Sequence, residues 1–218
     1  ADRECRQLIR HIHRNSPGAY IIVVGCYTQL QPEEVASIEG VDLVLGTNEK
    51  FKIFDFANHF QKNNYPKIFV SEIKKSDDFG IAYSGDADGR TRAFLKVQDG
   101  CDFKCTYCTI PLARGNSRSL PIDSIIQQAQ MLAEKGFKEV VLSGVNVRDY
   151  GKKIDTDLLS LLRSLVKVDG IERIRVSSIE PNLLTEPLID YMLGDEKICN
   201  HFHIPLQSGS NKILRLMS

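Results

Sequence analysis

Short apolar runs alternate with amphipathic stretches through the second half of this 218-residue chain. Strand candidates occupy residues 93–97, 139–143, 173–177 and 201–205, and helix candidates occupy residues 122–135, 158–167, 186–193 and 211–217. Because each helix follows a strand, the pattern predicts parallel strands joined by helical crossovers. Four such units predict part of an (α/β) barrel but cannot close one. We therefore expect either a fragment of a larger protein or an open sheet whose edge something else covers.

The first half of the chain shows the same alternation less regularly. Helix candidates are residues 1–14, 32–38 and 48–61, the last opened by the capping candidate Asn48, and strand candidates are residues 20–24 and 41–45. This order predicts a partial parallel α/β domain over residues 1–62. Residues 63–89 lack periodicity and are rich in turn-forming residues, which is typical of a linker. Residues 90–218 are then the partial barrel domain.

The composition excludes several classes of protein. Hydrophobic residues make up 42% of the chain and charged residues 26%, as in ordinary globular proteins. Lys plus Arg equals Asp plus Glu at 28 each, so no overall positive field attracts nucleic acid. No apolar run approaches the roughly 20 residues that cross a bilayer, and the charged start differs from a secretory signal. We expect a cytoplasmic protein with no membrane partner.

Three of the six cysteines stand within eight positions of one another. Cys101, Cys105 and Cys108 form a C-x3-C-x2-C triplet directly after the strand candidate 93–97. Iron–sulfur clusters are usually held by four cysteines, so a triplet indicates a cluster in which one iron is open to another ligand. The alternative is a structural zinc site, but zinc normally takes four protein ligands in paired motifs, and the chain has no second C-x2-C.

Other candidate ligands are less specific. Cys26 follows the strand candidate 20–24, where a small apolar core residue and a ligand are both plausible, since ligands collect at the carboxyl ends of parallel strands. Arg114 and Arg118 follow the triplet and could bind a cofactor carboxylate or an RNA phosphate, with ion pairing inside the protein as an equal alternative. His203 is a weaker candidate ligand. The remaining cysteines have no partner at ligand spacing and are predicted to be structural: Cys5 and Cys199.

The residues around the triplet resemble a known family. The cysteine triplet, with the aromatic residue Tyr107 before its last cysteine, resembles the signature of radical S-adenosylmethionine (SAM) enzymes. Residues 90–101, 110–115 and 203–210 are similar to the methylthiotransferases within that group. The head of the chain, together with Gly144-Val145-Asn146 and Asp149-Tyr150-Gly151, is most similar to the branch that acts on N6-threonylcarbamoyladenosine in tRNA.

The resemblance implies a specific chemistry. It assigns Cys101, Cys105 and Cys108 to a [4Fe-4S] cluster that binds SAM, and it implies addition of a methylthio group to an adenosine in the tRNA anticodon loop. The remaining candidates for cofactor binding are Tyr107, which lies within the triplet, and residues at predicted strand ends: Gly144, Asn146, Ser177, Glu180 and Gln207. Tyr107 could contact the adenine face, and Gly144 to Asn146 the methionine end. No residue is assigned a catalytic role, and the electron donor and sulfur source are not identified.

The resemblance also implies a second [4Fe-4S] cluster in a full-length protein. In the family an amino-terminal domain supplies three cysteines to it, and Gly25-Cys26-Tyr27 matches the last of these. The other two, the RNA-binding domain and the last barrel strands are expected outside this chain. Two alternatives keep the chemistry but change the substrate to isopentenyladenosine tRNA or a ribosomal protein. A third is a noncatalytic metal-binding module that contacts RNA.

Overall fold

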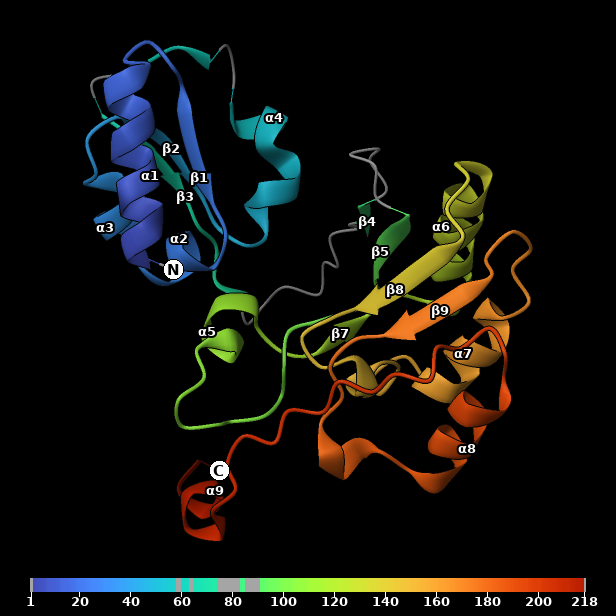
Figure 1. Ribbon diagram of the computed structural model, residues 1–218. Coiled ribbons are helices and arrows are strands. Elements are labelled where there is room, and N and C mark those ends of the chain that lie inside the picture. Colours follow the sequence, from blue (N-terminus) through green and yellow to red (C-terminus); the bar gives the residue numbers. More distant parts are fainter. Residues whose placement is uncertain (1, 58–59, 63–64, 74–82, 85–90, 218) are drawn as a thin grey trace. The chain divides into compact units, whose positions relative to one another are not determined.

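The protein divides into two compact units, which we describe separately. The computed structural model describes all residues except 1, 58–59, 63–64, 74–82, 85–90 and 218 (Figure 1). The first unit comprises Ala1–Gly80 together with Thr109–Gly115. The second comprises Ile81–Cys108 together with Asn116–Ser218. The short segment that follows Cys108 in the chain therefore belongs to the first unit, although the cysteines before it belong to the second.

The first unit is built on a parallel sheet of order β1-β2-β3. Its strands are β1 (Ile21–Val24), β2 (Val41–Leu45) and β3 (Lys67–Phe69). Its helices are α1 (Asp2–Asn15), α2 (Cys26–Leu30), α3 (Pro32–Ala36), the 3-10 helix η1 (Glu49–Lys52), α4 (Ile53–Phe56) and α5 (Ile110–Arg114). All five residues of β2 are buried, as expected for a central strand that is covered on both faces.

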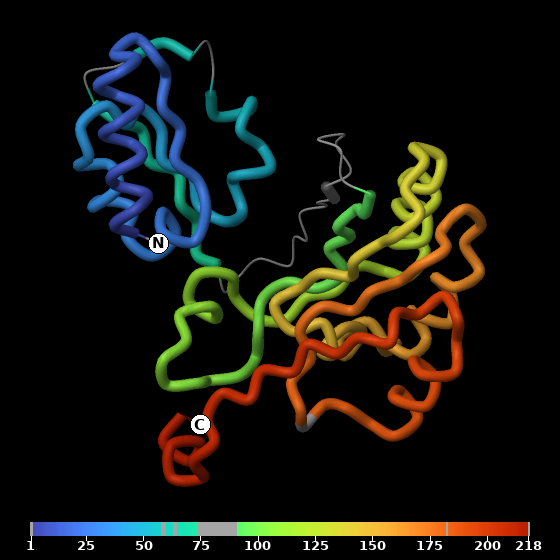
Figure 2. Tube along the Cα trace, in the orientation of Figure 1, coloured from blue at the N-terminus to red at the C-terminus, as the bar shows by residue number. Residues whose placement is uncertain are grey.

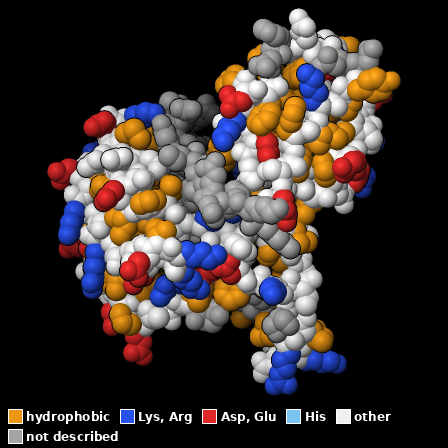
Figure 3. Space-filling view, turned by 180° about the vertical axis from the view of Figure 1, so that it is seen from behind, with side chains coloured by type: hydrophobic (Ala, Val, Ile, Leu, Met, Phe, Trp, Pro, Cys, Tyr) orange, Lys and Arg blue, Asp and Glu red, His pale blue; other side chains and the backbone are white. Residues whose placement is uncertain are grey.

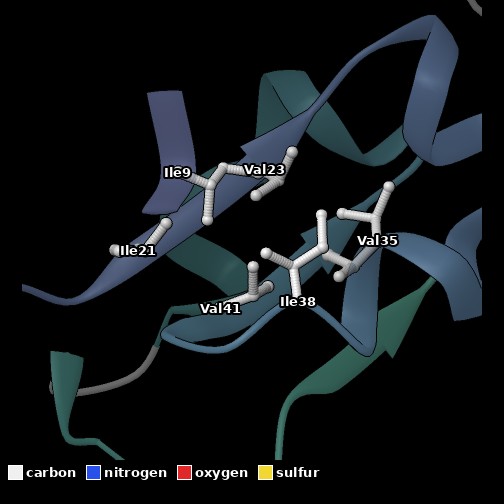
Figure 4. Close-up of a cluster of buried hydrophobic side chains, with 7 residues drawn as sticks. Ile9, Ile21, Val23, Val35, Ile38 and Val41 are labelled. Atoms are coloured by element: carbon white, nitrogen blue, oxygen red, sulfur yellow. The ribbon is translucent and has the colours of Figure 1, made fainter. Parts of the chain in front are cut away.

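Two apolar clusters cover the two faces of this sheet. One joins Ile9 of α1 and Val35 of α3 to β1 and β2, and Figure 4 shows these side chains converging. The other joins Leu43 and Leu45 of β2 to Ala57, with Ile53 packed against it. Successive side chains of a strand point to opposite faces, which is why Leu43 and its neighbour Val44 lie in different clusters.

The second unit contains a four-stranded sheet of order β4-β5-β8-β9. Strands β5 (Arg92–Lys96), β8 (Glu139–Ser143) and β9 (Arg173–Val176) are parallel, and β4 (Tyr83–Ser84) is antiparallel to β5. The helices are α6 (Ile122–Glu134), α7 (Leu158–Leu165), α8 (Glu186–Gly194) and α9 (Asn211–Met217), with 3-10 turns η4 (Val147–Asp149) and η5 (Pro181–Leu183). A small antiparallel pair, β6 (Gln98–Asp99) and β7 (Arg118–Ser119), lies beyond β5.

Helices α6 and α7 form the outer layer of this sheet. Buried leucines and isoleucines recur along both at helical spacing, including Ile125 and Leu132 in α6 and Leu161 and Leu165 in α7. The side chain of Asp157 caps α7 by accepting a hydrogen bond from the Ser160 amide at 2.8 Å. The parallel βα order that the sequence predicts is confirmed, and the carboxyl ends of β5, β8 and β9 lie at one edge.

Two predicted elements differ from the structure. The helix predicted over residues 48–61 is a 3-10 turn followed by the four-residue α4, and residues 58–59 lie outside the described residues. The side chain of Asn48 caps no helix; its Nδ2 donates to Ser71 Oγ at 3.0 Å. The strand predicted over residues 201–205 is wrong. Only the isolated bridge between Ser178 and His203 forms there, and Pro205 has no N–H to extend a ladder.

Strand β3 lies within the segment 63–89 that the sequence predicts as a linker. All three of its side chains are exposed, so the segment carries no burial periodicity to reveal it. Much of that segment lies outside the described residues. Among the residues that are described, no helix is long and apolar enough to cross a membrane. Figure 3 shows both signs of charge spread among hydrophobic side chains, in keeping with the equal totals of the sequence.

Candidate functional site

The three clustered cysteines lie on one irregular loop of the second unit, residues 101–108, which we call the cysteine loop. It follows β6 and thus leaves the sheet beyond the carboxyl end of β5, as the sequence predicts. All three thiols are free and partly buried. The Cys108 amide donates to the Cys105 carbonyl at 3.0 Å, which closes a turn between these two residues. The loop is therefore compact and accessible, as a cofactor-binding loop must be.

Gln98 fixes the base of this loop. Its side chain is fully buried, and its Nε2 donates to the Gly100 carbonyl at 2.7 Å and to Ser117 Oγ at 3.0 Å. Its Oε1 accepts from the Asn146 amide at 2.9 Å. A Cβ on Gly144 would lie 2.9 Å from the same Oε1, so packing explains a glycine at this predicted site residue. Gln98 thus joins the cysteine loop to the end of β8.

Charged groups brace the start of the loop. Asp99 is 2% exposed, and Lys96 Nζ lies 2.7 Å from its Oδ2 while Arg118 lies 3.7 Å away. Arg118, a predicted ligand of carboxylates or phosphates, is therefore in an ion pair within the protein. Asp102 Oδ1 accepts from the Ser117 amide at 3.0 Å, and Lys153 Nζ lies 3.1 Å from Oδ2.

The thiol of Cys101 is held in its protonated form by its surroundings. Burial raises the pKa of this thiol, and the Asp149 carboxylate and the Cys108 and Cys105 thiols raise it further, against a lowering backbone hydrogen bond at Phe103. Metal binding requires thiolates, so a bound cation has to displace the proton that these neighbours favour. Three cysteines on one loop match the donor types of an iron–sulfur cluster.

Two of the predicted cofactor-binding residues meet at the tip of the loop. The Tyr107 hydroxyl donates to Gln207 Oε1 at 2.9 Å. Burial raises the pKa of Tyr107, and the negative charges of Cys105, Cys108 and Glu180 add to the shift. Gln207 holds a backbone φ of 62°, a left-handed conformation that is uncommon for a residue with a side chain.

The carboxyl-terminal helix also holds the tip of the loop. The Thr106 amide donates to the Met217 carbonyl at 3.0 Å, and its hydroxyl donates to the Leu216 carbonyl at 3.1 Å. Figure 2 shows the green cysteine loop running close to the red end of the chain. Because the last carbonyls of a helix have no partner within it, they are free to accept these bonds.

Two further predicted residues present unsatisfied polar atoms. Asn146 is 4% exposed, yet within the described part of the chain neither its side-chain oxygen nor its nitrogen has a hydrogen-bond partner. The buried Ser177 Oγ also has no hydrogen-bond partner among the described residues. Both residues follow strands of the parallel sheet, β8 and β9. Buried polar groups without partners are rare in folded proteins, so these atoms fit a ligand at the strand ends.

Cys26 lies in the first unit, directly after β1. It begins α2 behind Gly25, whose φ is 122°, so the predicted position at a parallel strand end is confirmed. Arg114 Nε donates to Cys26 Sγ at 3.4 Å. Helix α5, which carries Arg114, is anchored in this unit by the bond from Thr47 Oγ1 to the Ala113 carbonyl at 2.7 Å. Arg114 thus contacts a sulfur.

The residues present do not suffice for a second cluster. Apart from Cys26, the only cysteine of the first unit is Cys5, which packs against the apolar cluster of α1 and α3.

In the second unit, the candidate ligand His203 is hydrogen-bonded, with its Nδ1 2.8 Å from Ser178 Oγ. Among the described residues, no group of three or more His, Cys, Asp or Glu side chains is placed so that it could hold a metal ion. The ligation of a cluster therefore stays a prediction.

Sequence reasoning missed the residues that support the cysteine loop. They are Gln98, Asp99, Asp102, Ser117, Asp149, Lys152 and Lys153. One signal was available for the first two, because polar residues stood directly between a buried apolar strand and the first cysteine. The others approach from later segments of the chain, and only the folded structure brings them near.

Comparisons with known proteins identify the family of this chain. A family model described as the radical SAM superfamily matches residues 95–218. The threonylcarbamoyladenosine tRNA methylthiotransferase MtaB of Aquifex aeolicus is 40% identical over 99% of this chain and 53% of the relative. MtaB of Bacillus subtilis is 41% identical over 99% of this chain and 48% of the relative. The chain thus spans about half the length of these curated relatives.

Relatives with a different substrate name are also similar. The tRNA-2-methylthio-N(6)-dimethylallyladenosine synthase of Thermodesulfovibrio yellowstonii is 36% identical over 96% of this chain and 48% of the relative. Among solved structures, TsrM of Kitasatospora setae, a radical SAM methyltransferase with tryptophan and a SAM analogue bound, aligns with a TM-score of 0.69. It covers 97% of this chain and 45% of TsrM at 15% identity, and so shows the fold alone.

Proposed function

The chain belongs to the radical SAM superfamily, and we propose that it acts in a methylthiotransferase that modifies N6-threonylcarbamoyladenosine in the anticodon loop of tRNA. The observation that carries the proposal is the cysteine loop, held beyond the carboxyl end of a parallel strand in a chain about 40% identical to MtaB proteins. Such a substrate places the reaction in the cytoplasm. The activity belongs to a protein about twice the length of this chain in the relatives.

Cys101, Cys105 and Cys108 are the proposed ligands of a [4Fe-4S] cluster whose fourth iron binds SAM. When bound, this pair supplies a radical that can remove hydrogen from an unreactive carbon, using one electron from a low-potential donor. The chain itself has to hold the thiolates in place and shield the site. Gln98 and Asp99 do the first by fixing the chain just before the loop, and Thr106 does so by bonding the loop to α9.

The polar groups at the strand ends are the proposed SAM contacts. Tyr107 and Gln207 are hydrogen-bonded to each other at the tip of the cysteine loop, so one cofactor could touch both, and Glu180 is a further proposed contact. The unsatisfied side-chain atoms of Asn146 offer a donor and an acceptor, which suit the carboxylate and amino groups of a methionine. Ser177 Oγ supplies a further hydroxyl, and Gly144 is a proposed contact through its backbone, since a Cβ there would lie 2.9 Å from Gln98 Oε1.

Anaerobic reconstitution tests the cluster. Wild-type protein is expected to bind iron and sulfide at about four each and to cleave SAM when reduced with dithionite. A matched control is Cys199→Ser, which removes a thiol outside the cysteine loop and should leave both values unchanged. One tightly held zinc in place of iron would favour the noncatalytic module.

Nucleoside analysis tests the substrate. Cells that lack the full gene are expected to lose the methylthio group from N6-threonylcarbamoyladenosine alone, and the wild-type gene should restore it. Loss from the isopentenyl or dimethylallyl derivative would move the protein to the branch represented by the synthase of Thermodesulfovibrio yellowstonii. Loss from neither, with a change in a ribosomal protein, would support the remaining alternative.

A further inference from the structure

One motif of the sequence, Asp149-Tyr150-Gly151, has no part in the proposed function so far. It belongs to a turn after β8, residues 149–153, which we call the lysine turn. Tyr150 is fully buried, and its hydroxyl donates to the Leu120 carbonyl at 2.7 Å. Gly151 has a φ of 88°, and a Cβ there would collide with the Thr156 carbonyl. Its amide donates to Ser119 Oγ at 2.9 Å. The backbone of the turn is thus firmly held.

The side chains of the lysine turn face the first half of the cysteine loop. Lys153 Nζ lies 3.1 Å from Asp102 Oδ2. Lys152 forms an ion pair with Asp149, and its Nζ also lies 5.9 Å from the centre of the Phe103 ring. Asp102 and Phe103 are the two residues that follow Cys101. Asp149 itself is 1% exposed, so the carboxylate that pairs with Lys152 is held away from solvent.

We propose that Asp149 and Lys152 are positioning residues that set the reduction potential of the cluster bound at Cys101, while Lys153 holds the cysteine loop through Asp102. The proposal rests on the proposed function, because it assumes that the loop holds a cluster. Burial and nearby charge are levers by which proteins tune such clusters. A buried carboxylate opposes the added electron and a neighbouring ammonium favours it, so the two members of one ion pair have opposite effects.

The direction in which each variant changes the reduction potential distinguishes electrostatic tuning of the cluster from structural support of the loop. If the pair only held the loop, removing either member would loosen it, and both variants would change in the same direction. If the pair sets the potential, Asp149→Asn should make the cluster easier to reduce and Lys152→Met should make it harder. At a fixed solution potential, the ratio of reduced to oxidised cluster should rise in Asp149→Asn and fall in Lys152→Met, each by a factor on the order of three to ten.

The experiment uses the full-length protein, reconstituted without oxygen and titrated with a reductant while the reduced cluster is followed by electron paramagnetic resonance. The double variant Asp149→Asn with Lys152→Met removes both charges and should titrate close to wild type. Lys138→Gln is the matched control, because Lys138 is 59% exposed and pairs with Glu172 in the same unit. It should leave the midpoint unchanged.

A second measurement, of the role of Lys153, can be made on protein without a cluster. In metal-free protein, Lys153→Met should speed hydrogen exchange of the amides in residues 101–108, while Lys138→Gln should not. Exchange unchanged by Lys153→Met would overturn the holding role. Equal or same-direction shifts of the midpoint in Asp149→Asn and Lys152→Met would overturn the tuning role. If Asp149→Asn loses iron, the direction of the shift in Lys152→Met decides the matter. A wild-type protein that binds no cluster refutes the proposed function instead.

Discussion

The cysteine loop and Cys26 are both predicted metal sites, but the chain supports them very differently. The loop carries three cysteines, and residues from at least four other segments bond to it, including Ser117, Lys153 and Gln207. Cys26 is a single cysteine at the end of β1, and its sulfur accepts one hydrogen bond from Arg114. The comparison teaches that a ligand set within one loop can be judged from one chain, whereas a cluster at Cys26 would need cysteines that the first unit does not contain.

The largest expected effect tests the loop directly. Replacing Cys105 by Ala should abolish SAM cleavage, because one iron of the cluster loses its protein ligand. Product formation would be measured by chromatography after reduction of the reconstituted protein. Cys199→Ala serves as the control and should keep its activity. Cleavage at the wild-type rate in Cys105→Ala would refute the assignment of the loop.

Cys26 should show the opposite behaviour in a full-length protein. Cys26→Ala is expected to leave SAM cleavage within about twofold of wild type, since the bond of Cys26 to Arg114 lies within the first unit. Methylthio transfer to tRNA should fall sharply, as the family resemblance implies. Both products would be quantified in the same reaction. If cleavage and transfer vanish together, Cys26 supports folding instead, and the contrast between the two sites is lost.

A third change tests whether the base of the loop is structurally necessary. Gln98→Ala should lower the free energy of unfolding by about 2–3 kcal/mol, because it leaves several buried polar groups without partners. Urea denaturation followed by circular dichroism would measure it. The exposed Gln127 in the same unit, replaced by Ala, provides a control of the same residue type. A loss below about 0.5 kcal/mol would show that water replaces the side chain.

The smallest effect is expected at the tip of the loop. Tyr107→Phe removes the hydroxyl that donates to Gln207 but keeps the aromatic face. Because the pair is exposed, stability should change by no more than about 0.5 kcal/mol, and the Kd for SAM should rise by less than about tenfold. Calorimetric titration with SAM would measure the change. An increase larger than this would assign Tyr107 a direct polar contact with the cofactor.

The sequence by itself determined the parallel α/β architecture, the place of the cysteine loop after β5 and the position of Cys26. These are local properties: apolar runs, helical periodicity and ligand spacing can be read along the chain. Strand β2 and helix α9 appear within the predicted bounds for this reason.

Only the tertiary structure decided what surrounds the loop. No periodicity announces that Gln98 would bond to the end of β8, or that Lys152 and Lys153 would reach the residues after Cys101. Likewise, residues 48–61 have a helical pattern, yet the Asn48 side chain bonds to Ser71 and the helix stays short. Contacts between residues distant in the chain depend on how elements pack, and packing is a property of the whole fold rather than of any local stretch.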